Sequence, residues 1–422
     1  MSRSIQNNRA GVTVIEVLFA TGIVIFGLIG IASLIAVAGR QVTQSNEAVE
    51  AQAVARLWYS DFVSRGFNDA STWRWYNDQA APASRYVTFT NSGAPATGTS
   101  AGGSRTAFRH AICIDPAFFA DATTSSSLGL TFASGQVYRP GLFPYYQDNY
   151  DPLTYPITSP GFSTTVNMPR LLRVSLQLPG SSFNPMPAKL VEQLFMSRDD
   201  LSKFANEQDQ TISAVRIFDG TASKSLSGAK YSWFATLCPR EFLSAEVIPP
   251  PALPGLTANT SVGEKYYTLS IVVLSQRDRT FFIPTTDTNP EGLPQGERLL
   301  RVSSPTASPP TPPTNFRDGG GGRVKLTGPD TVSDKIRVGD WVMLSKNMIT
   351  PAPANLHVGT VCRWFRVIGL SAESEIVGAT WSRDVILDGP DWFFDALGTA
   401  RETQATLVSN VVTVLERVIP VF

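Results

Sequence analysis

The N-terminal part of the chain decides the fold: residues 12–39 read VTVIEVLFATGIVIFGLIGIASLIAVAG. Glu16 is the one ionisable side chain in this run, and the 23 residues from Val17 to Gly39 carry no charge. An α-helix rises about 1.5 Å per residue, so this stretch reaches about 35 Å and exceeds the roughly 30 Å hydrocarbon core of a bilayer. The run therefore predicts a transmembrane helix.

Charged residues on either side of the run bear on its orientation. Arg3 and Arg9 lie in the polar segment 1–11, and Arg40 follows the run directly. Basic residues before a span favour a cytoplasmic N-terminus, although Arg40 weakens the asymmetry. We therefore expect a single pass through the cytoplasmic (inner) membrane, with the bulk of the chain on the extracytoplasmic side.

Glu16 is costly in this position, because a carboxylate inside a bilayer costs about 2.5–3.5 kcal/mol on insertion scales. One interpretation places Glu16 at the level of the lipid headgroups. The other supposes cleavage between Gly11 and Val12, which puts a new ammonium group one helical turn from Glu16. Two such helices packed with an axial offset could pair Glu16 of one with the Val12 amine of its neighbour.

Residues 11–18, which read GVTVIEVL, carry a family resemblance. They resemble the signal of type IV prepilins and type II secretion pseudopilins, in which a short basic leader ends in Gly and a Glu stands at mature position five. The continuation GIVIFGLIGIASL is most similar to that of the PilV-type minor pilins. Val12 departs mildly from the family, which usually has Phe there. The resemblance covers about 50 residues, an eighth of the chain.

This resemblance implies a structural subunit that works by assembly, with no catalytic residues, cofactor or metal. It implies cleavage after Gly11 by prepilin peptidase, N-methylation of Val12, and a role for Glu16 in assembly. The implied partners are the peptidase, other pilin or pseudopilin subunits, an assembly platform in the inner membrane, and membrane lipid. It leaves a pilus and a type II secretion pseudopilus both open, and the size of the chain favours a minor subunit.

An ordinary secretory signal is the rival interpretation. Residues 36–38 (Ala-Val-Ala) match an A-x-A cleavage site that would leave Gly39 as the new N-terminus. Signal-peptide apolar regions have about 7–15 residues, and this run is longer. If the rival holds, the chain is a secreted or membrane-anchored β-rich adhesin or binding protein outside any filament.

Residues 40–66 continue the helical pattern beyond the apolar run. Their apolar side chains recur at helical spacing, with Trp58 and Phe62 widening the stripe, and Gly66 marks the expected end. The stripe that this spacing predicts consists of Val42, Val49, Ala53 and Leu57. We expect one helix that runs on from the membrane span.

The rest of the chain has a β-rich composition: Gly and Pro total 62 of 422 residues, and 17% are charged. We predict an α+β fold, with a long N-terminal transmembrane and amphipathic helix and a large antiparallel β-rich domain that carries a small barrel-like insertion. The predicted segments are a leader (1–11), two helix halves (12–39 and 40–66), a pilin-type β domain (67–302), a Pro/Gly-rich linker (303–322), a small β module (323–395) and a C-terminal strand (396–422).

Several strands follow from local patterns. Alternating apolar residues in 172–178 predict a half-buried strand, and residues 187–207 predict a short helix with Leu190, Leu194 and Phe195 on one face. Further strands are expected at 231–237 and 267–274, and at four places within 323–387. We expect residues 405–422 to return to the main sheet and pair with 267–274.

Composition excludes several classes of function. The 35 basic and 35 acidic side chains balance, which argues against a nucleic-acid binder. Two histidines and three cysteines without metal-ligand spacing argue against a zinc site and against an enzyme. The glycines at 319–322 lack the following Lys-Ser/Thr of a phosphate loop, so a flexible joint is the better interpretation.

Two weaker candidates remain open. Calcium could bind the oxygen-rich loop at Asp148 and Asp151, although ordinary turn chemistry accounts for that loop. It could also bind an EF-hand-like loop at Asp287, which is incomplete because Arg298 stands where a bidentate Glu is needed. A Cys113–Cys238 disulfide is compatible with an oxidising compartment, but three cysteines cannot all pair within one chain.

Overall fold

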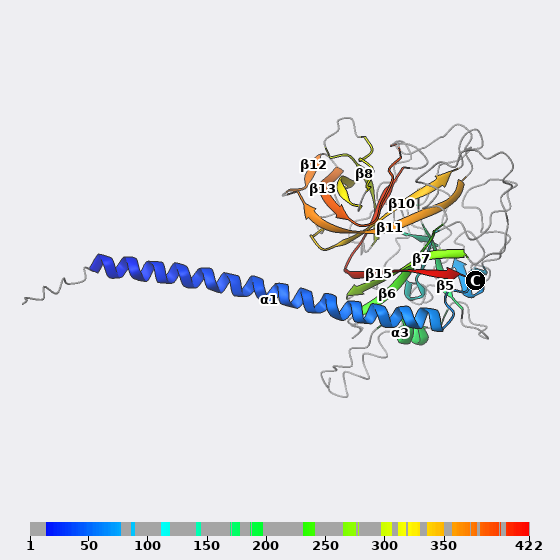
Figure 1. Ribbon diagram of the computed structural model, residues 1–422, viewed down its shortest axis with the longest axis horizontal. Helices are drawn as coiled ribbons and strands as arrows, with labels where there is room; N and C mark the ends of the chain where they lie inside the picture. Colours follow the sequence, from blue (N-terminus) through cyan, green and yellow to red (C-terminus); the bar gives the residue numbers. More distant parts are fainter. Residues whose placement is uncertain are drawn as a thin grey trace, which may run out of the picture. The chain divides into compact units, whose positions relative to one another are not determined.

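The computed structural model in Figure 1 describes residues 14–76, 86–88, 111–118, 141–144, 169, 171–177, 186, 188–196, 231–240, 265–275, 277, 297–305, 311–317, 320–329, 336–349, 357–371, 373–377, 380–395, 397 and 402–421. The chain divides into two compact units, Met1–Glu50 and Ala51–Phe422. The first unit contributes the N-terminal part of one long helix. The second contains the end of that helix and all the strands.

Helix α1 spans Val14–Ser64 and is continuous over 51 residues. It ends just before Gly66, whose φ of +69° lies in the left-handed region that glycine adopts without a Cβ penalty. The sequence prediction of a single helix that ends near Gly66 is therefore confirmed. A short 3-10 turn, Ala70–Thr72, then leads into the first strand.

The buried face of α1 differs from the predicted stripe. Val49 and Leu57 are 66% and 62% exposed, whereas the buried side chains recur at intervals of four, three and four: Ala51, Ala55, Trp58 and Phe62. The prediction was correct for the two aromatic residues and wrong for the aliphatic ones. The two alanines and the two aromatic side chains of this face all belong to one buried apolar cluster, in which small and large side chains pack together.

The first sheet has eight strands in the order β15-β7-β6-β3-β5-β1-β2, with β4 beside β5. Its neighbours are antiparallel except β3 and β5, which are parallel. Helix α3, Ala188–Phe195, covers β6 with Leu194 and Phe195 buried and Leu190 packed against them, which confirms the predicted face. It ends well before the predicted bound of 207, because Met196 forms an isolated bridge with Ser232 of β6. The strands are β1 (Trp73–Tyr76), β2 (Tyr86–Thr88), β3 (Ile112–Ile114), β4 (Leu142–Phe143), β5 (Leu171–Leu176), β6 (Tyr231–Pro239), β7 (Lys265–Ser275) and β15 (Val411–Val421).

The second sheet closes into a barrel. Its strands follow the order β11-β10-β14-β8-β9-β13-β12, and an additional antiparallel pairing between β11 and β13 completes a ring of six. The small barrel-like module expected from the sequence is present. The strands are β8 (Glu297–Ser303), β9 (Gly322–Pro329), β10 (Trp341–Ile349), β11 (His357–Leu370), β12 (Glu375–Val377), β13 (Thr380–Asp388) and β14 (Gln404–Val408).

The C-terminal segment supplies one strand to each sheet. β15 pairs antiparallel with β7 from Val411 opposite Leu274 to Val421 opposite Lys265, which confirms the predicted return to the main sheet. β14, however, lies between β8 and β10 in the barrel. Asn410, with φ of 62°, forms the turn between β14 and β15. The ring of six thus includes β8, which begins before the expected linker, and β14, which follows the expected module.

The glycine run near residue 320 is tightly packed, and the predicted flexible joint is wrong for its described part. A Cβ on Gly320 would lie 1.7 Å from the carbonyl oxygen of Gly389, and one on Gly321 would lie 2.5 Å from that of Leu387. Both glycines have φ values near +70° to +85°. Close backbone approach at the start of β9 therefore requires glycine here.

Both faces of the first sheet are covered, by α1 and α3 on one side and by the barrel on the other. Trp233, Ala235 and Leu237 of β6 face the helices, while Phe234 and Cys238 face the barrel. Figure 1 shows β10 and β11 lying over β6, β7 and β15. For this reason every residue of β5 is buried, and the prediction of a half-buried strand is wrong.

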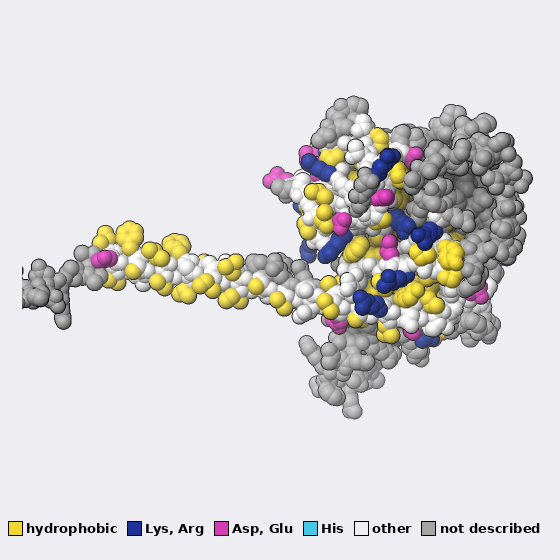
Figure 2. All heavy atoms as spheres, viewed as in Figure 1, with side chains coloured by type: hydrophobic (Ala, Val, Ile, Leu, Met, Phe, Trp, Pro, Cys, Tyr) yellow, Lys and Arg dark blue, Asp and Glu magenta, His cyan; other side chains and the backbone are white. Residues whose placement is uncertain are grey.

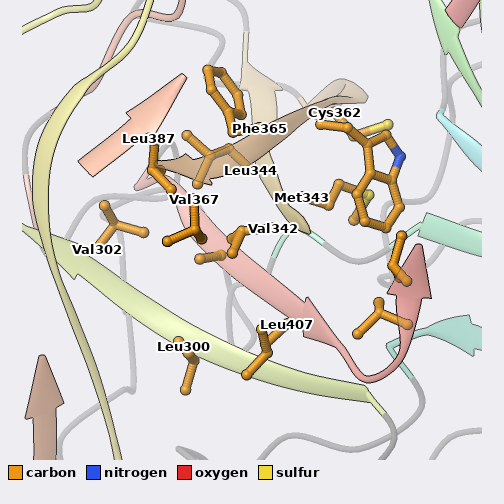
Figure 3. Packing of buried hydrophobic residues seen from close by; sticks show 14 of the residues in the cluster. Leu300, Val302, Val342, Met343, Leu344, Cys362, Phe365, Val367, Leu387 and Leu407 are labelled. Carbon is orange, nitrogen blue, oxygen red and sulfur yellow. The ribbon is translucent and has the colours of Figure 1, made fainter. Parts of the chain in front are cut away.

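The barrel has its own apolar interior, seen from close by in Figure 3. Val302, Val367 and Leu387, from β8, β11 and β13, lie close together in this view, whereas Cys362 and Met343 lie apart from them. Cys362 and Trp364 of β11 contact the first sheet instead. The strand β11 is therefore shared between the barrel interior and the junction with the sheet.

Candidate functional site

The N-terminal part of α1 is long and apolar enough to cross a membrane. The segment Val14–Ile35 has 22 residues, and none of its most apolar window is buried against the rest of the chain. At about 1.5 Å per residue it reaches about 33 Å. Figure 2 shows hydrophobic side chains along this part of the helix. It is consistent with a signal sequence or a single membrane anchor.

The two hydroxyl side chains within this segment are satisfied by the helix itself. Thr21 Oγ1 donates to the carbonyl oxygen of Val17, and Ser33 Oγ donates to that of Gly30 at 2.7 Å. In lipid, every polar group must find its partner inside the protein, so hydroxyls bonded back to the preceding turn suit an apolar surrounding.

Glu16 lies in the first turn of α1 and is exposed. Acidic side chains in a first turn interact favourably with the unpaired N–H groups of a helix N-terminus. Gly11 and Val12, the two residues of the expected cleavage site, lie outside the described residues. The spacing between Val12 and Glu16 accordingly stays a prediction.

Four charged side chains, three of them buried and Arg277 partly buried, lie where the first sheet meets the barrel. Arg173 on β5 donates through Nη1 to Asp115 Oδ2 at 2.5 Å and through Nη2 to Glu297 Oε2 on β8. Arg277 donates to both oxygens of Asp115, at 2.8 and 2.6 Å, and lies 3.7 Å from Glu297. Two cations and two carboxylates thus form a neutral group, which we call the junction cluster.

Burial and pairing have opposing effects on the junction cluster. Burial raises the pKa of Asp115, but the charges and hydrogen bonds of Arg277 and Arg173 outweigh it, so its pKa lies below the usual value. Burial likewise opposes the charge on Arg173, yet Glu297 and Asp115 together raise its pKa. The pKa of Arg277 is raised as well, chiefly by Asp115 against the effect of burial, so Asp115, Arg173 and Arg277 stay charged at neutral pH. Their pairing replaces much of the solvation that burial removes.

Aromatic rings complete the surroundings of these charges. The guanidinium of Arg173 lies 3.8 Å from the ring centre of Phe118 and 5.1 Å from that of Phe143. Arg277 lies 5.6 Å from the ring centre of Phe234. Desolvated cation–π contacts of this kind contribute attraction from the ring face and exclude water. The cluster is built as a fixed junction, with no solvent-exposed carboxylate available for chemistry.

Neutral hydrogen bonds extend the junction along β11. Trp364 Nε1 donates to Thr236 Oγ1 of β6 at 3.0 Å. The backbone N–H of Ala111 donates to the carbonyl oxygen of Thr360 at 2.8 Å, and Ser345 Oγ donates to that of Pro169 at 2.8 Å. Each bond joins the first sheet or a segment beside it to the barrel, so the two sheets meet in a defined register.

The three cysteines are buried and not bonded to one another. Cys113 and Cys238 both face the barrel side of the first sheet, but Cys238 contacts Cys362 of β11 and not Cys113. The backbone N–H of Cys362 donates to Cys238 Sγ at 3.3 Å. Burial raises the pKa of Cys238, but a hydrogen bond from the Cys362 thiol and the charge of Arg363 leave it below the usual value. The same hydrogen bond raises the pKa of Cys362 well above its usual value.

Sequence reasoning missed the junction cluster. Its members come from four separate segments, and Asp115 and Arg277 are 162 residues apart. The available signal was Arg173, a charged residue inside an otherwise apolar strand. The candidate calcium ligands Asp148, Asp151 and Asp287 lie outside the described residues. Among the residues that the structure describes, no three His, Cys, Asp or Glu side chains gather as a metal site.

Comparison with known proteins adds no relative. No protein-family model matches the chain, and no curated protein matches it.

Proposed function

We propose that the chain is a minor pilin or pseudopilin-like subunit of a type IV pilus or a type II secretion-type filament. In this proposal prepilin peptidase cleaves between Gly11 and Val12, and the processed chain assembles with other subunits through α1 and Glu16. The single observation that supports it is the helix α1, which is unbroken from an exposed apolar segment to a buried aromatic anchor. That arrangement suits a subunit that packs by one end of a helix and carries a globular domain on the other.

Two features of the exposed residues fit this proposal. Among the described residues, none of the most apolar window of Val14–Ile35 is buried. Val42, Val49 and Leu57 are also 59–66% exposed, although they have the spacing of a packing stripe. Neighbouring subunits or lipid would cover such side chains, which would otherwise expose apolar area to water.

Before assembly, the proposed subunit crosses the inner membrane once, with the β-rich domain on the extracytoplasmic side. Its partners are the peptidase, an assembly platform in that membrane, neighbouring subunits and lipid. Glu16 would then lie in an apolar surrounding, where a carboxylate is costly without a counter-charge. The N-methylated amine of Val12 on an adjacent subunit is the counter-charge that we propose.

Mass spectrometry of the N-terminus, on protein isolated from its native membrane, tests this function. The expected result is a chain that begins at N-methylated Val12. A chain that begins at Gly39 would overturn the proposal in favour of a secreted adhesin or binding protein, and an intact Met1 would favour a plain membrane anchor. The rival cleavage site after Ala38 lies within the continuous helix α1.

Substitution of Glu16 tests the assembly step separately. Glu16→Ala should abolish incorporation into sheared filaments while leaving the amount of membrane-inserted chain unchanged, because insertion alone does not need the carboxylate. Glu47→Ala is the matched control, since Glu47 is an exposed glutamate of the same helix outside the apolar segment. Equal incorporation of both variants would contradict the role of Glu16.

A further inference from the structure

Cys238 and Cys362 meet where the first sheet touches the barrel. β11 pairs with β10 along one edge, and its other edge pairs with β13 only from Arg366 onwards. Before that point the second edge of β11 faces the first sheet: Thr360 accepts a hydrogen bond from Ala111, and Cys362 donates its N–H to Cys238 Sγ. The Cys238 sulfur thus accepts the backbone hydrogen bond of Cys362 that a carbonyl oxygen of a neighbouring strand would otherwise accept.

The separation between these residues suits a covalent bond. The Cys238 sulfur is 3.3 Å from the backbone nitrogen of Cys362. Both residues are 2% exposed, so both cysteines lie in the protein interior. A disulfide needs Cα atoms about 4.4–6.8 Å apart and Cβ atoms about 3.5–4.5 Å apart, and a sulfur in contact with the backbone of the other cysteine is compatible with that range.

The other pairing within reach is excluded by strand register. Cys113 on β3 lies opposite Thr236 on β6, so Cys238 is two residues further along the same face. Diagonal neighbours of this kind are about 7–8 Å apart, which exceeds the reach of a disulfide without backbone movement. Cys113 is also held beside Arg173, its register partner on β5.

We propose that Cys238 and Cys362 form an intrachain disulfide that joins the first sheet to the barrel, and that Cys113 stays a thiol. The inference rests on the extracytoplasmic location in the proposed function, because disulfides persist in oxidising compartments. The bond closes a segment of 124 residues and crosses the junction beside the hydrogen bond between Trp364 and Thr236. It would hold the barrel on the sheet when a filament is under load.

The chemistry requires a disulfide donor, either a thiol-disulfide oxidoreductase of the compartment or a small-molecule disulfide. One cysteine, as thiolate, attacks the donor disulfide, forms a mixed disulfide and releases one donor thiolate. The second cysteine, also deprotonated, attacks the sulfur of the first and releases the other donor thiolate. Two thiols of the chain are oxidised and one donor disulfide is reduced to two thiols. Because both cysteines are buried in the folded chain, the exchange takes place before the barrel packs on the sheet.

Thiol counting on the native chain tests the proposal. The full-length protein is isolated from membranes without reductant, denatured in excess iodoacetamide, digested, and analysed by mass spectrometry. The expected result is one alkylated cysteine, Cys113, and a cross-linked peptide pair that contains Cys238 and Cys362. Three alkylated cysteines, or a link that includes Cys113, would overturn the proposal. The N-terminus is read from the same digest, so a start at methylated Val12 together with three free thiols would reject the disulfide and leave the proposed function intact.

Variants and reductant provide a second measurement. Reductant should lower the thermal midpoint of the wild-type chain and of Cys113→Ser by a similar margin, because both retain the bond. It should leave the midpoints of Cys238→Ser and Cys362→Ser unchanged. An equal response to reductant in all four proteins would contradict the assignment. The midpoint with reductant is compared with the midpoint without it for the same protein. A variant that is less stable at the outset therefore still shows whether it contains the disulfide.

Discussion

The two faces of the first sheet are both buried, yet they are buried by different means. The face toward α1 and α3 is lined by aromatic and aliphatic side chains, with Trp233 stacked on Trp58 and Phe195 at centroid distances of 5.8 and 4.4 Å. The face toward the barrel contains Arg173 and Asp115, both fully buried, among hydroxyls and thiols. Apolar contact is non-directional, whereas paired charges and hydrogen bonds define one register. The helices are therefore held on the sheet mainly by the burial of apolar surface, and the barrel is held there by ion pairs and hydrogen bonds.

The largest expected effect comes from removing the cation shared by both carboxylates. Arg173→Met should lower the free energy of unfolding by about 3–5 kcal/mol, and we expect the upper end because Asp115 and Glu297 both lose a partner. Urea unfolding of the detergent-solubilised chain, followed by tryptophan fluorescence, measures it. Arg173→Lys keeps the charge but lacks the planar guanidinium, so its free energy of unfolding should lie between those of the wild type and Arg173→Met. An Arg173→Met protein as stable as the wild type would show that the cluster contributes nothing to the junction.

A substitution on the apolar face should lower the free energy of unfolding by a comparable amount, but this loss should not depend on pH. Trp233→Ala should cost about 3–4 kcal/mol, because a large cavity opens against Trp58, Phe62 and Phe195. The Trp233 Nε1 bond to the Leu194 carbonyl is lost as well. This cost should be the same at pH 5 and pH 8. The cost of Arg173→Met should shrink at acidic pH, because unpaired buried carboxylates accept protons. Parallel pH dependence of the two variants would contradict the distinction between the faces.

A smaller loss of stability should come from removing one hydrogen bond on the barrel side while most of the apolar contact is kept. Trp364→Phe keeps the ring beside Phe234 but removes the donor to Thr236, so it should cost about 0.5–1.5 kcal/mol for the lost bond, and somewhat more for the reduced ring area. Thr236→Val is the matched change in the acceptor. In a double-mutant cycle the second substitution should cost less once the first is made. Additive costs would mean that the hydrogen bond does not couple the sheet to the barrel.

The sequence predicted most of what depends on local patterns. An uncharged run specifies the apolar helix, and β-branched alternation specifies β7 and β15 and their pairing, because such strands have one well-defined partner register. The features that the sequence did not predict depend on which distant elements pack over a strand or helix. Whether β5 is half-buried or fully buried is decided by the barrel on its outer face. The buried side of α1 was missed because two of its four buried residues are alanines, which give a weak hydrophobic signal in sequence.

The candidate sites also divide into one that a local sequence pattern indicates and others that only the folded chain brings together. Glu16 could be singled out because an isolated charge in an apolar run is conspicuous in sequence. The junction cluster and the Cys238–Cys362 contact join residues more than a hundred positions apart, and no spacing rule relates them. The glycine run shows the opposite limit of sequence reasoning. Its pattern is typical of a flexible joint, yet Gly320 and Gly321 make close backbone contacts and Gly322 packs against the Phe316 ring.

The smallest expected effect concerns Glu416 on β15, on the barrel side of the sheet. Its carboxylate accepts from Ser270 Oγ at 3.1 Å and lies 3.8 Å from Arg363 of β11. Burial raises its pKa, and these partners offset the rise only in part. A group whose pKa is raised on folding stabilises the folded state below its unfolded pKa of about 4.3, and that contribution is lost as pH rises through the folded value. Asp115, whose pKa is lowered, has the opposite sign and loses its contribution as pH falls.

Glu416→Gln isolates the first of these two contributions, because glutamine keeps the shape and the bond to Ser270 but cannot titrate. The wild type should therefore lose stability relative to the variant as pH rises from about 4 to neutrality, and the difference should level off once Glu416 is ionised in both states. Urea midpoints at closely spaced pH values measure that difference. A wild type that gains stability relative to the variant over the same range would mean that Arg363 outweighs burial, and that this part of the barrel side is held by charge pairing after all.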